Sequence, residues 1–213
     1  MSTSDRKEKV RKIRQEDIIN AAEKVFFAKG FHNATMDEVA KEAEYSKRTI
    51  YVYFSSKEQI YDAIILRAYQ HLNRMFKTAV EHDNPADGLK KVLLLGKTYL
   101  EFVTAFPEYF EAMIQYENRE EDLINQDEFK AASYREGDVS VALLIGFIRE
   151  GIADGSITAD FDATNLAFVL YANIIGTGNL ILKKEKYIRH SYQKDLPELI
   201  SEQFKLLVRA LKP

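Results

Sequence analysis

The chain has 213 residues, 46% of them hydrophobic, and a formal net charge of −3, so it is long and apolar enough to bury a substantial core. It contains no cysteine, which excludes disulfides, thiolate metal sites and a thiol nucleophile, and fits a reducing cytoplasm. Apolar runs such as 92–95 and 141–145 fall far short of the roughly 20 residues of a membrane helix, and residues 1–15 lack the apolar region of a secretory signal.

Residues 1–14 are expected to form a basic N-terminal arm. Six cations precede the first expected helix, against Asp5 and Glu8: Arg6, Lys7, Lys9, Arg11, Lys12 and Arg14. Residues 1–61 carry 12 Lys/Arg and 10 Asp/Glu, whereas residues 62–213 carry 18 and 23, so positive charge gathers near the N-terminus. A flexible basic arm can follow a DNA backbone or enter the minor groove. A disordered, solubilising tail explains the same composition.

A first helix is expected from about Gln15 to Lys29. Apolar residues recur there at helical spacing, and Gly30 is a C-terminal stop signal. The expected buried face consists of Ile18, Ile19, Ala22, Val25 and Phe26.

The stretch 35–58 is expected to hold two short helices joined by a tight turn. Thr35 and Glu38 have the spacing of a capping box, and Ser46 is the next good helix cap. The second helix then follows as Lys47–Phe54. Its inner face carries Ile50 and Phe54, and its outer face carries Lys47, Arg48, Thr49 and Tyr51.

A helix, a turn of about three residues and a second helix form the geometry that places the second helix in the major groove of DNA. Lys and Arg bind phosphates or guanine, Thr meets a base edge or the thymine methyl, and Tyr hydroxyls donate to phosphates. Ser55 and Glu58 have the spacing of a further box, and the helix start with Lys57 can hold a phosphate. Taken one by one, these residues are equally well explained as solvated or half-buried side chains.

The rest of the chain is expected to be helical, so the fold class is all-α. One helix of some 25 residues starts at Ser56. Three further helices are expected: one over about 86–105, a short one that begins at Pro107 and has the sequence PEYFEAMIQYEN, and one over about 127–154. The acidic stretch 117–128 is expected to be a loop. Asp162 is expected to cap a helix that runs to about Lys183, and Asp195 and Glu198 are expected to form a capping box at the start of the last helix. These last two helices are expected to form a four-helix bundle between two chains.

Aromatic residues and methionine are frequent in the C-terminal part, and they can line an apolar effector pocket or simply fill a core. An apolar or aromatic ligand fits them best. The predicted pocket residues are Tyr99, Phe102, Phe106, Phe110, Met113, Tyr116, Phe147, Phe168, Tyr171 and Asn173. No catalytic, phosphate-loop or metal motif is present in the sequence, so neither an enzyme, a cofactor nor a metal site is expected.

Residues 18–64 resemble the DNA-binding domain of TetR-type transcriptional regulators. The resemblance rests on AA then VF, a Gly ending the first helix, the Thr cap, VA, and then SK, T, IY, YF and KE. It implies an all-helical homodimer, usually a repressor that a small molecule releases from its operator. It also implies phosphate contacts from Thr35, Tyr53 and Lys57. The full DNA-binding set predicted is Thr35, Met36, Ser46, Lys47, Arg48, Thr49, Tyr51, Tyr53 and Lys57.

The chain departs from the family pattern at Glu44-Tyr45, where Gly-Val is usual. A non-glycine residue with positive φ costs on the order of 1 kcal/mol, so the turn is either strained or reshaped. The expected organisation is a helix-turn-helix domain over 15–61 and an effector-binding and dimerisation domain over 62–213. The expected function is operator binding by a dimer in the cytoplasm. The alternatives are a ligand-binding or protein-interaction module whose reading head is no longer used, and an enzyme.

Overall fold

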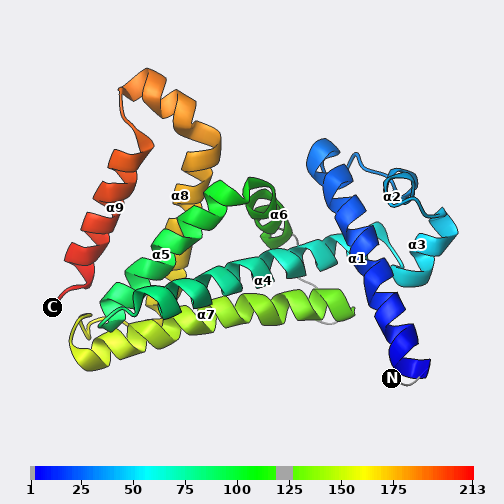
Figure 1. Ribbon diagram of the computed structural model, residues 1–213. Coiled ribbons are helices and arrows are strands. Elements are labelled where there is room, and N and C mark those ends of the chain that lie inside the picture. Colours follow the sequence, from blue (N-terminus) through cyan, green and yellow to red (C-terminus); the bar gives the residue numbers. More distant parts are fainter. Residues whose placement is uncertain (1–2, 119–126) are drawn as a thin grey trace. The chain divides into compact units, whose positions relative to one another are not determined.

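The computed structural model describes residues 3–118 and 127–213, and every regular element in them is an α-helix (Figure 1). The all-α prediction is therefore confirmed. The helices are α1 Thr3–Lys29, α2 Met36–Glu42, α3 Lys47–Tyr53, α4 Lys57–Asp83, α5 Gly88–Ala105, α6 Pro107–Glu117, α7 Glu128–Asp154, α8 Ala163–Tyr192 and α9 Leu196–Leu211.

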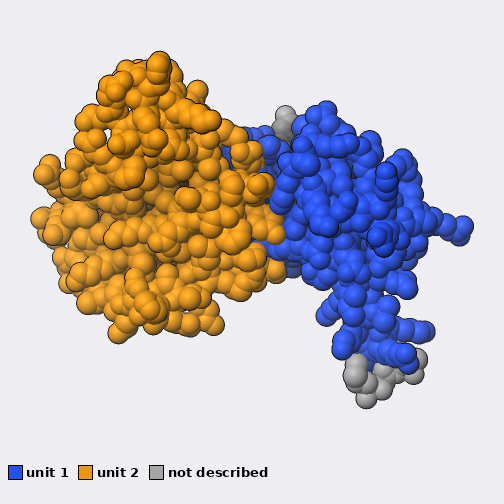
Figure 2. Space-filling view, turned by 45° about the horizontal axis from the view of Figure 1, so that its top comes forward, with its two compact units in different colours: residues 1–68, 112–135 blue, residues 69–111, 136–213 orange. Residues whose placement is uncertain are grey.

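The chain divides into two compact units (Figure 2). Unit 1 comprises residues 1–68 and 112–135, and unit 2 comprises residues 69–111 and 136–213. The division falls within α4, α6 and α7. The functional boundary expected after residue 61 stays a prediction.

In unit 1, α1 packs against α2 and α3, and α2 packs against α3. The contact is apolar: Ile18, Val39, Ile50 and Phe54 are completely buried. Ile50 and Phe54 lie one turn apart, as an inward-facing helical stripe requires. This small core fixes the orientation of α3 on α1.

Helix α1 begins at Thr3, twelve residues before the start expected at Gln15. The basic segment is thus helical, and the expectation of a flexible arm is wrong. Most of its residues are Lys, Arg or Glu, which are strong helix formers, and it contains neither Gly nor Pro. The helix that starts at the core therefore extends through it. The helix ends as expected, because Gly30 takes φ +77° and its amide donates to the Phe26 carbonyl at 2.8 Å.

Helix α4 is capped one residue later than the sequence suggested. The Ser56 hydroxyl accepts from the Gln59 amide at 3.1 Å, while the Gln59 side chain accepts from the Ser55 amide at 2.6 Å. The predicted pair of Ser55 and Glu58 is therefore wrong, since both Ser55 and Ser56 are possible caps and the sequence alone does not choose between them. The 27-residue length agrees closely with the expected long helix.

Residues 112–118 and 127–135 join unit 1 through hydrogen bonds to α4. The Tyr61 hydroxyl donates to the Ala112 carbonyl at 3.0 Å, and the Ser133 hydroxyl donates to the Asp62 carbonyl at 2.9 Å. Phe54 also contacts Phe129, with ring centroids 5.3 Å apart. The predicted acidic loop 117–128 lies largely outside the described residues.

In unit 2, α5 packs against α8 and α9. Asp87 caps α5, and the Asp154 carboxylate accepts a further hydrogen bond from the Gly88 amide at 2.8 Å. A β-carbon at Gly88 would lie 2.1 Å from the Gly151 nitrogen. This close backbone contact fixes the start of α5 on the last turns of α7.

The C-terminal helices differ from expectation in length and capping. Helix α8 continues nine residues past Lys183 and ends at Tyr192. Asp195 makes no capping hydrogen bond to α9 and instead accepts from Arg189 at 3.1 Å, so the predicted box with Glu198 is wrong. The amide of Thr158 donates to the Leu211 carbonyl at 2.7 Å, and Leu211 is buried.

One helix among the described residues, α8, is long and apolar enough by length and composition to cross a membrane. Only 33% of its most apolar window is buried in the chain. Core helices of soluble proteins meet the same criteria, and α8 packs on α5 and α9, so this is weak evidence for a membrane segment.

Candidate nucleic-acid interface

The second helix of the candidate motif, α3, is positioned by its caps and by its buried side. The Thr35 hydroxyl accepts from the Glu38 amide at 3.3 Å and the Glu38 carboxylate accepts from the Thr35 amide at 3.0 Å, which is the predicted capping box. Ser46 accepts from the Thr49 amide at 3.1 Å and so starts α3 as predicted. Ser46 and Thr49 also hydrogen-bond through their hydroxyls at 2.8 Å.

The turn between α2 and α3 contains the strained residue that the sequence indicated. Glu44 has φ +57°, in the left-handed region. Its amide donates to the Lys41 carbonyl at 3.2 Å, and the Tyr45 amide donates to the Ala40 carbonyl at 3.0 Å. These two bonds form a Schellman motif, in which glycine usually occupies the left-handed position. The turn is therefore strained: it keeps the Schellman hydrogen bonds with a non-glycine residue at the left-handed position.

The outward face of α3 carries Arg48, Tyr51 and Val52. All three are exposed, Tyr51 by 47% and Val52 by 69%. Positions 48, 51 and 52 lie on one helical face, opposite the buried Ile50. The guanidinium of Arg48 suits a guanine or a phosphate, and the phenol of Tyr51 suits a phosphate oxygen. The branched apolar side chain of Val52 suits a thymine methyl group.

Val52 is a candidate that the sequence reasoning missed. The available signal was its spacing, since it lies four residues after Arg48 and so shares that residue's face. Because Val52 is apolar and lies close in sequence to the core residue Ile50, it was not considered as a surface residue.

Two predicted groove residues have local partners. Lys47 donates to the Asp37 carboxylate at 2.8 Å, and this hydrogen bond raises the pKa of Lys47. The Thr49 hydroxyl is bonded to Ser46, which holds it at the helix start. Both remain on the surface, so these contacts orient them at the candidate interface and do not bury them.

Tyr53 and Tyr45 tie α3 and its turn to α1. The Tyr53 hydroxyl accepts from Arg14 at 3.1 Å, which raises the pKa of the Arg14 guanidinium. The Tyr45 hydroxyl donates to Asp17 at 3.0 Å, and this bond raises the pKa of Tyr45. Arg14 and Tyr45 therefore belong to the support of the interface, which the sequence alone did not indicate.

Lys57 is engaged inside unit 1. Its ammonium donates to the carbonyls of Phe31 at 2.8 Å and Ala34 at 3.0 Å, and it lies 4.4 Å from the centroid of the Phe31 ring. In this structure it braces the connection between α1 and α2. It also donates to the His32 carbonyl at 3.5 Å, so all three N–H donors of the ammonium are engaged. A phosphate contact by Lys57 would have to replace at least one of these hydrogen bonds.

Met36 is only 8% exposed and contributes to the core of unit 1. Its side chain is therefore not available to DNA, and the prediction that this side chain contacts DNA is corrected. The apolar side of α2 includes Met36 because Val39 and Ala40 follow it three and four residues later.

The predicted effector residues do not form one set. Met113 and Tyr116 belong to unit 1, and the others belong to unit 2. Within unit 2, Tyr99, Phe102, Phe106 and Phe110 are neighbours, with successive ring centroids 5.6 to 6.4 Å apart. Tyr99, Phe102 and Phe110 are buried, so this aromatic cluster is packed core.

Four further predicted pocket residues lie elsewhere in unit 2. Phe147 packs against a second apolar cluster, which includes Leu89 and Ile148. Phe168 is 54% exposed and Asn173 is exposed as well, so neither lines an enclosed pocket within this chain. Both residues lie on α8, whose exposed side the sequence pattern did not separate from its buried side. Tyr171 is half-buried.

The described part of the chain, residues 3–118 and 127–213, contains no group of three or more His, Cys, Asp or Glu suited to a metal ion.

The helix-turn-helix geometry coincides with a sequence match. The family model of bacterial regulatory proteins of the tetR family matches residues 18–64, which span α1 to the first part of α4. Residues 18–64 are therefore a DNA-binding domain of the tetR type. This family consists of transcriptional regulators and not of enzymes, in agreement with the absence of catalytic motifs in the sequence.

Known proteins resemble different shares of the chain. A curated relative, the uncharacterised regulator YdgC of Bacillus subtilis, is 30% identical over 88 residues, which cover 40% of this chain and 45% of YdgC. The chain thus spans about half the length of this relative. By structure, FadR of Bacillus subtilis in complex with stearoyl-CoA has a TM-score of 0.68 at 23% identity and covers 92% of this chain and 98% of that one.

A second similar structure is that of AibR in complex with isovaleryl coenzyme A and operator DNA, with a TM-score of 0.61 at 18% identity. It covers 78% of this chain and 86% of AibR. At such identities both likenesses establish the fold alone.

Proposed function

We propose that this protein is a DNA-binding transcriptional regulator, acting as a repressor, that binds a palindromic operator as a homodimer in the cytoplasm. The observation that carries the proposal is α3, which is anchored by Ile50 and Phe54 and exposes Arg48, Tyr51 and Val52. A short, capped helix with this division of faces fits the major groove as a recognition helix.

Roles follow from where each side chain lies. Arg48, Tyr51 and Val52 read base edges, and Lys47 and Thr49 contact bases or phosphates at the helix start. Thr35, Ser46 and Tyr53 are exposed or half-exposed polar groups at helix ends, and they contact the phosphate backbone. Lys57 adds a phosphate contact only if it leaves a backbone carbonyl that it now binds.

Dimerisation through α8 and α9 explains the apolar side chains that these helices expose. Within this chain, Phe168 is 54% exposed, Val169 64% and Leu206 67%. Two copies of α8 and α9 would cover such faces in a four-helix bundle. A twofold axis then supplies two recognition helices, which is what a palindromic operator requires.

A small molecule with an apolar part is proposed as the effector. Support comes from the aromatic composition of unit 2 and from two relatives of the same fold, which are complexed with stearoyl-CoA and isovaleryl-CoA. Acyl-CoA thioesters of different chain lengths are therefore the probes of choice. Release of the protein from a labelled operator by one of them, and not by free CoA, is the expected result. If no thioester changes operator affinity, the effector class is wrong.

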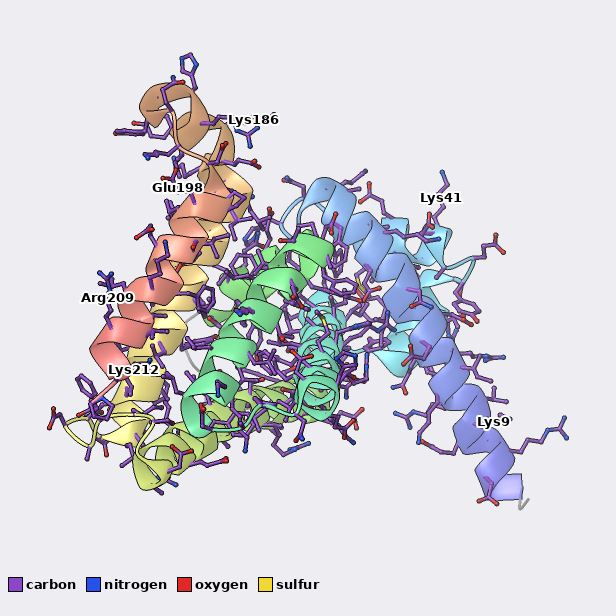
Figure 3. All side chains as sticks on the ribbon, turned by 60° about the vertical axis from the view of Figure 1, so that its left-hand side comes forward. Lys9, Lys41, Lys186, Glu198, Arg209 and Lys212 are labelled. Carbon is purple, nitrogen blue, oxygen red and sulfur yellow. The ribbon has the colours of Figure 1, made fainter. Side chains whose placement is uncertain are left out.

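The DNA-binding function is tested by fluorescence anisotropy with duplexes from the region upstream of the protein's own gene and with a scrambled duplex. Wild-type protein should prefer one upstream duplex. The Arg48→Gln variant should lose most of that preference, since one good base contact is worth about 1–3 kcal/mol. The matched control is Lys41→Gln, which removes one exposed cation from α2 (Figure 3).

Lys41→Gln should keep the preference for the upstream duplex. If the two variants prefer the upstream duplex to the same degree, Arg48 is not one of the residues that contact bases. Wild-type protein that binds no duplex at low salt would favour the alternative, a ligand-binding module with a disused reading head.

A further inference from the structure

The N-terminal part of α1, here called the overhang (residues 5–14), extends beyond the core of unit 1. Every residue in it is exposed, whereas Ile18 and Ile19 in the following turn are buried. Figure 1 shows this end of α1 projecting past α2 and α3, and Figure 3 shows Lys9 pointing into solvent from it. Ten residues of α-helix give a rod of about 15 Å.

The charges of the overhang are divided between its two sides. At 3.6 residues per turn, four cations fall within an arc of about 140°. These are Arg6, Lys7, Arg11 and Arg14. The remaining arc holds both acids of the segment and an equal number of cations: Asp5, Glu8, Lys9 and Lys12. One side is therefore cationic, and the other is neutral, with Lys12 placed 4.0 Å from Glu8.

The cationic side faces the same way as the buried side of α1. Lys7, Arg11 and Arg14 are followed at helical spacing by Ile18, which packs in the core with α2 and α3. Arg14 itself donates to Tyr53 in the last turn of α3. The cations thus lie on the same side of α1 as the recognition helix, in the part of α1 that extends beyond the core.

We infer that the cationic side of the overhang is an additional contact surface for the DNA backbone next to the recognition helix. The inference rests on the proposed function and extends it. Exposed Lys and Arg on one side of a rigid rod would neutralise phosphates and release counterions without reading sequence. A helical rod places these charges without the ordering cost that a flexible arm would have. Arg14 connects this surface to α3, and Lys7 and Arg11 are its outer contacts.

The test compares two charge-matched double variants of the full chain: Lys7→Gln with Arg11→Gln on the cationic side, and Lys9→Gln with Lys12→Gln on the neutral side. Glutamine has nearly the helix propensity of Lys and Arg, and far-ultraviolet circular dichroism checks that the helix content is kept. The probe is the upstream duplex that wild-type protein prefers, with the scrambled duplex alongside it. The measurement is the slope of log affinity against log salt concentration.

The cationic-side variant should reduce the steepness of the slope by about 0.9 for each phosphate that is no longer neutralised, or about 3.6 for two such phosphates in each subunit of a dimer. Its affinity should fall by a similar factor on both duplexes, so that sequence preference is kept. The neutral-side variant should keep a slope close to that of wild type. In hydroxyl-radical footprinting, the cationic-side variant should lose protection over no more than about four nucleotides per strand, the reach of the rod at 3.4 Å per nucleotide.

Equal slopes for wild type and both double variants would overturn the inference and leave the proposed function intact, because wild type would still bind. An equal decrease of the slope in both double variants would also overturn it, since the effect would then come from net charge and not from one side of the helix. Absence of DNA binding by wild type would instead refute the proposed function, and this inference with it.

Discussion

Glu44 occupies a backbone position that costs free energy. It has φ +57° in the Schellman turn that ends α2, where the β-carbon of an L-residue is crowded. The side chain is exposed, so it offers little packing in return. The turn between α2 and α3 therefore keeps Glu44 at a positive φ although a non-glycine residue prefers a negative one.

Replacing Glu44 with glycine should stabilise the protein by about 0.5–1 kcal/mol, because glycine adopts positive φ without strain and loses only part of that gain to chain entropy. Urea unfolding measures the change. The control, Lys41→Gly, places the same residue at an exposed helical position of α2 and should destabilise by about 1 kcal/mol. A loss of stability in both variants would contradict the strain at Glu44.

Lys57 gives a second residue-level prediction, on stability without DNA. Lys57→Met keeps the side-chain stem but removes the ammonium that binds the carbonyls of Phe31 and Ala34. Because the site is only partly buried, the expected loss is about 1 kcal/mol in the free energy of unfolding. The control Lys41→Met should change it by less than about 0.5 kcal/mol. Unchanged stability in Lys57→Met would mean that the lysine serves phosphate binding alone.

At the scale of elements, the start of α5 depends on the absence of a side chain at Gly88. A β-carbon there would lie 2.1 Å from the nitrogen and 2.4 Å from the α-carbon of Gly151, and these backbone atoms cannot give way as the end of a flexible side chain can. Gly88→Ala should therefore lower the free energy of unfolding by at least about 1–3 kcal/mol.

The control for Gly88→Ala is Gly146→Ala in α7. A β-carbon at Gly146 would meet nothing within 4 Å, and alanine is the better helix former by about 1 kcal/mol. Thermal unfolding followed by circular dichroism should thus separate the two variants in sign. A small effect at Gly88 would mean that α5 and α7 can separate at low cost.

Most helices could be predicted from the sequence because their signals are local. Thr35, Ser46 and Asp162 cap helices as their spacing indicated, and Pro107 begins α6. Capping depends on three or four adjacent residues, so no tertiary information is needed.

Errors occurred where two local signals compete or where a distant partner decides. Asp195 has the spacing of a cap but binds Arg189, and Ser56 replaces Ser55 as the cap of α4. The length of α1 was underestimated because its first turns bury nothing, and hydrophobic periodicity detects only helices with a buried side.

The candidate interface was predictable to a similar degree. The order of residues from Ser46 to Phe54 indicated the recognition helix, and its inner and outer faces followed from helical spacing. The local partners of Lys47 and Lys57 could not be predicted, because each lies on another element. The effector-pocket residues stay a prediction, and aromatic residues at helical spacing do not reveal which of them, like Phe168, face outward in the single chain.

At the scale of the whole molecule, the proposed dimer makes a prediction about α8 and α9. Leu206 is 67% exposed in the single chain. If it is covered by a second subunit, Leu206→Glu places a charge in an apolar interface and should convert the dimer to a monomer at micromolar concentration. Analytical ultracentrifugation measures the mass. Operator affinity should fall with it, because one chain engages only one half-site.

The control for Leu206→Glu is Val139→Glu on α7, where the valine is 51% exposed and lies outside the proposed interface. This variant should keep the dimeric mass. A dimer that survives Leu206→Glu, or a wild-type mass of one chain, would contradict the placement of the interface on the last two helices.

The hydrogen bond between the Thr158 amide and the Leu211 carbonyl has a consequence for how the protein is made. Leu211 is buried in the same apolar cluster as Leu89 and Ile148. The ribosome therefore has to deliver the chain as far as Leu211 before this cluster can close, while α1, α2 and α3 can already pack on one another. During synthesis the nascent chain would carry a folded reading head ahead of an unfinished apolar core, which is the stage at which chaperones are most needed.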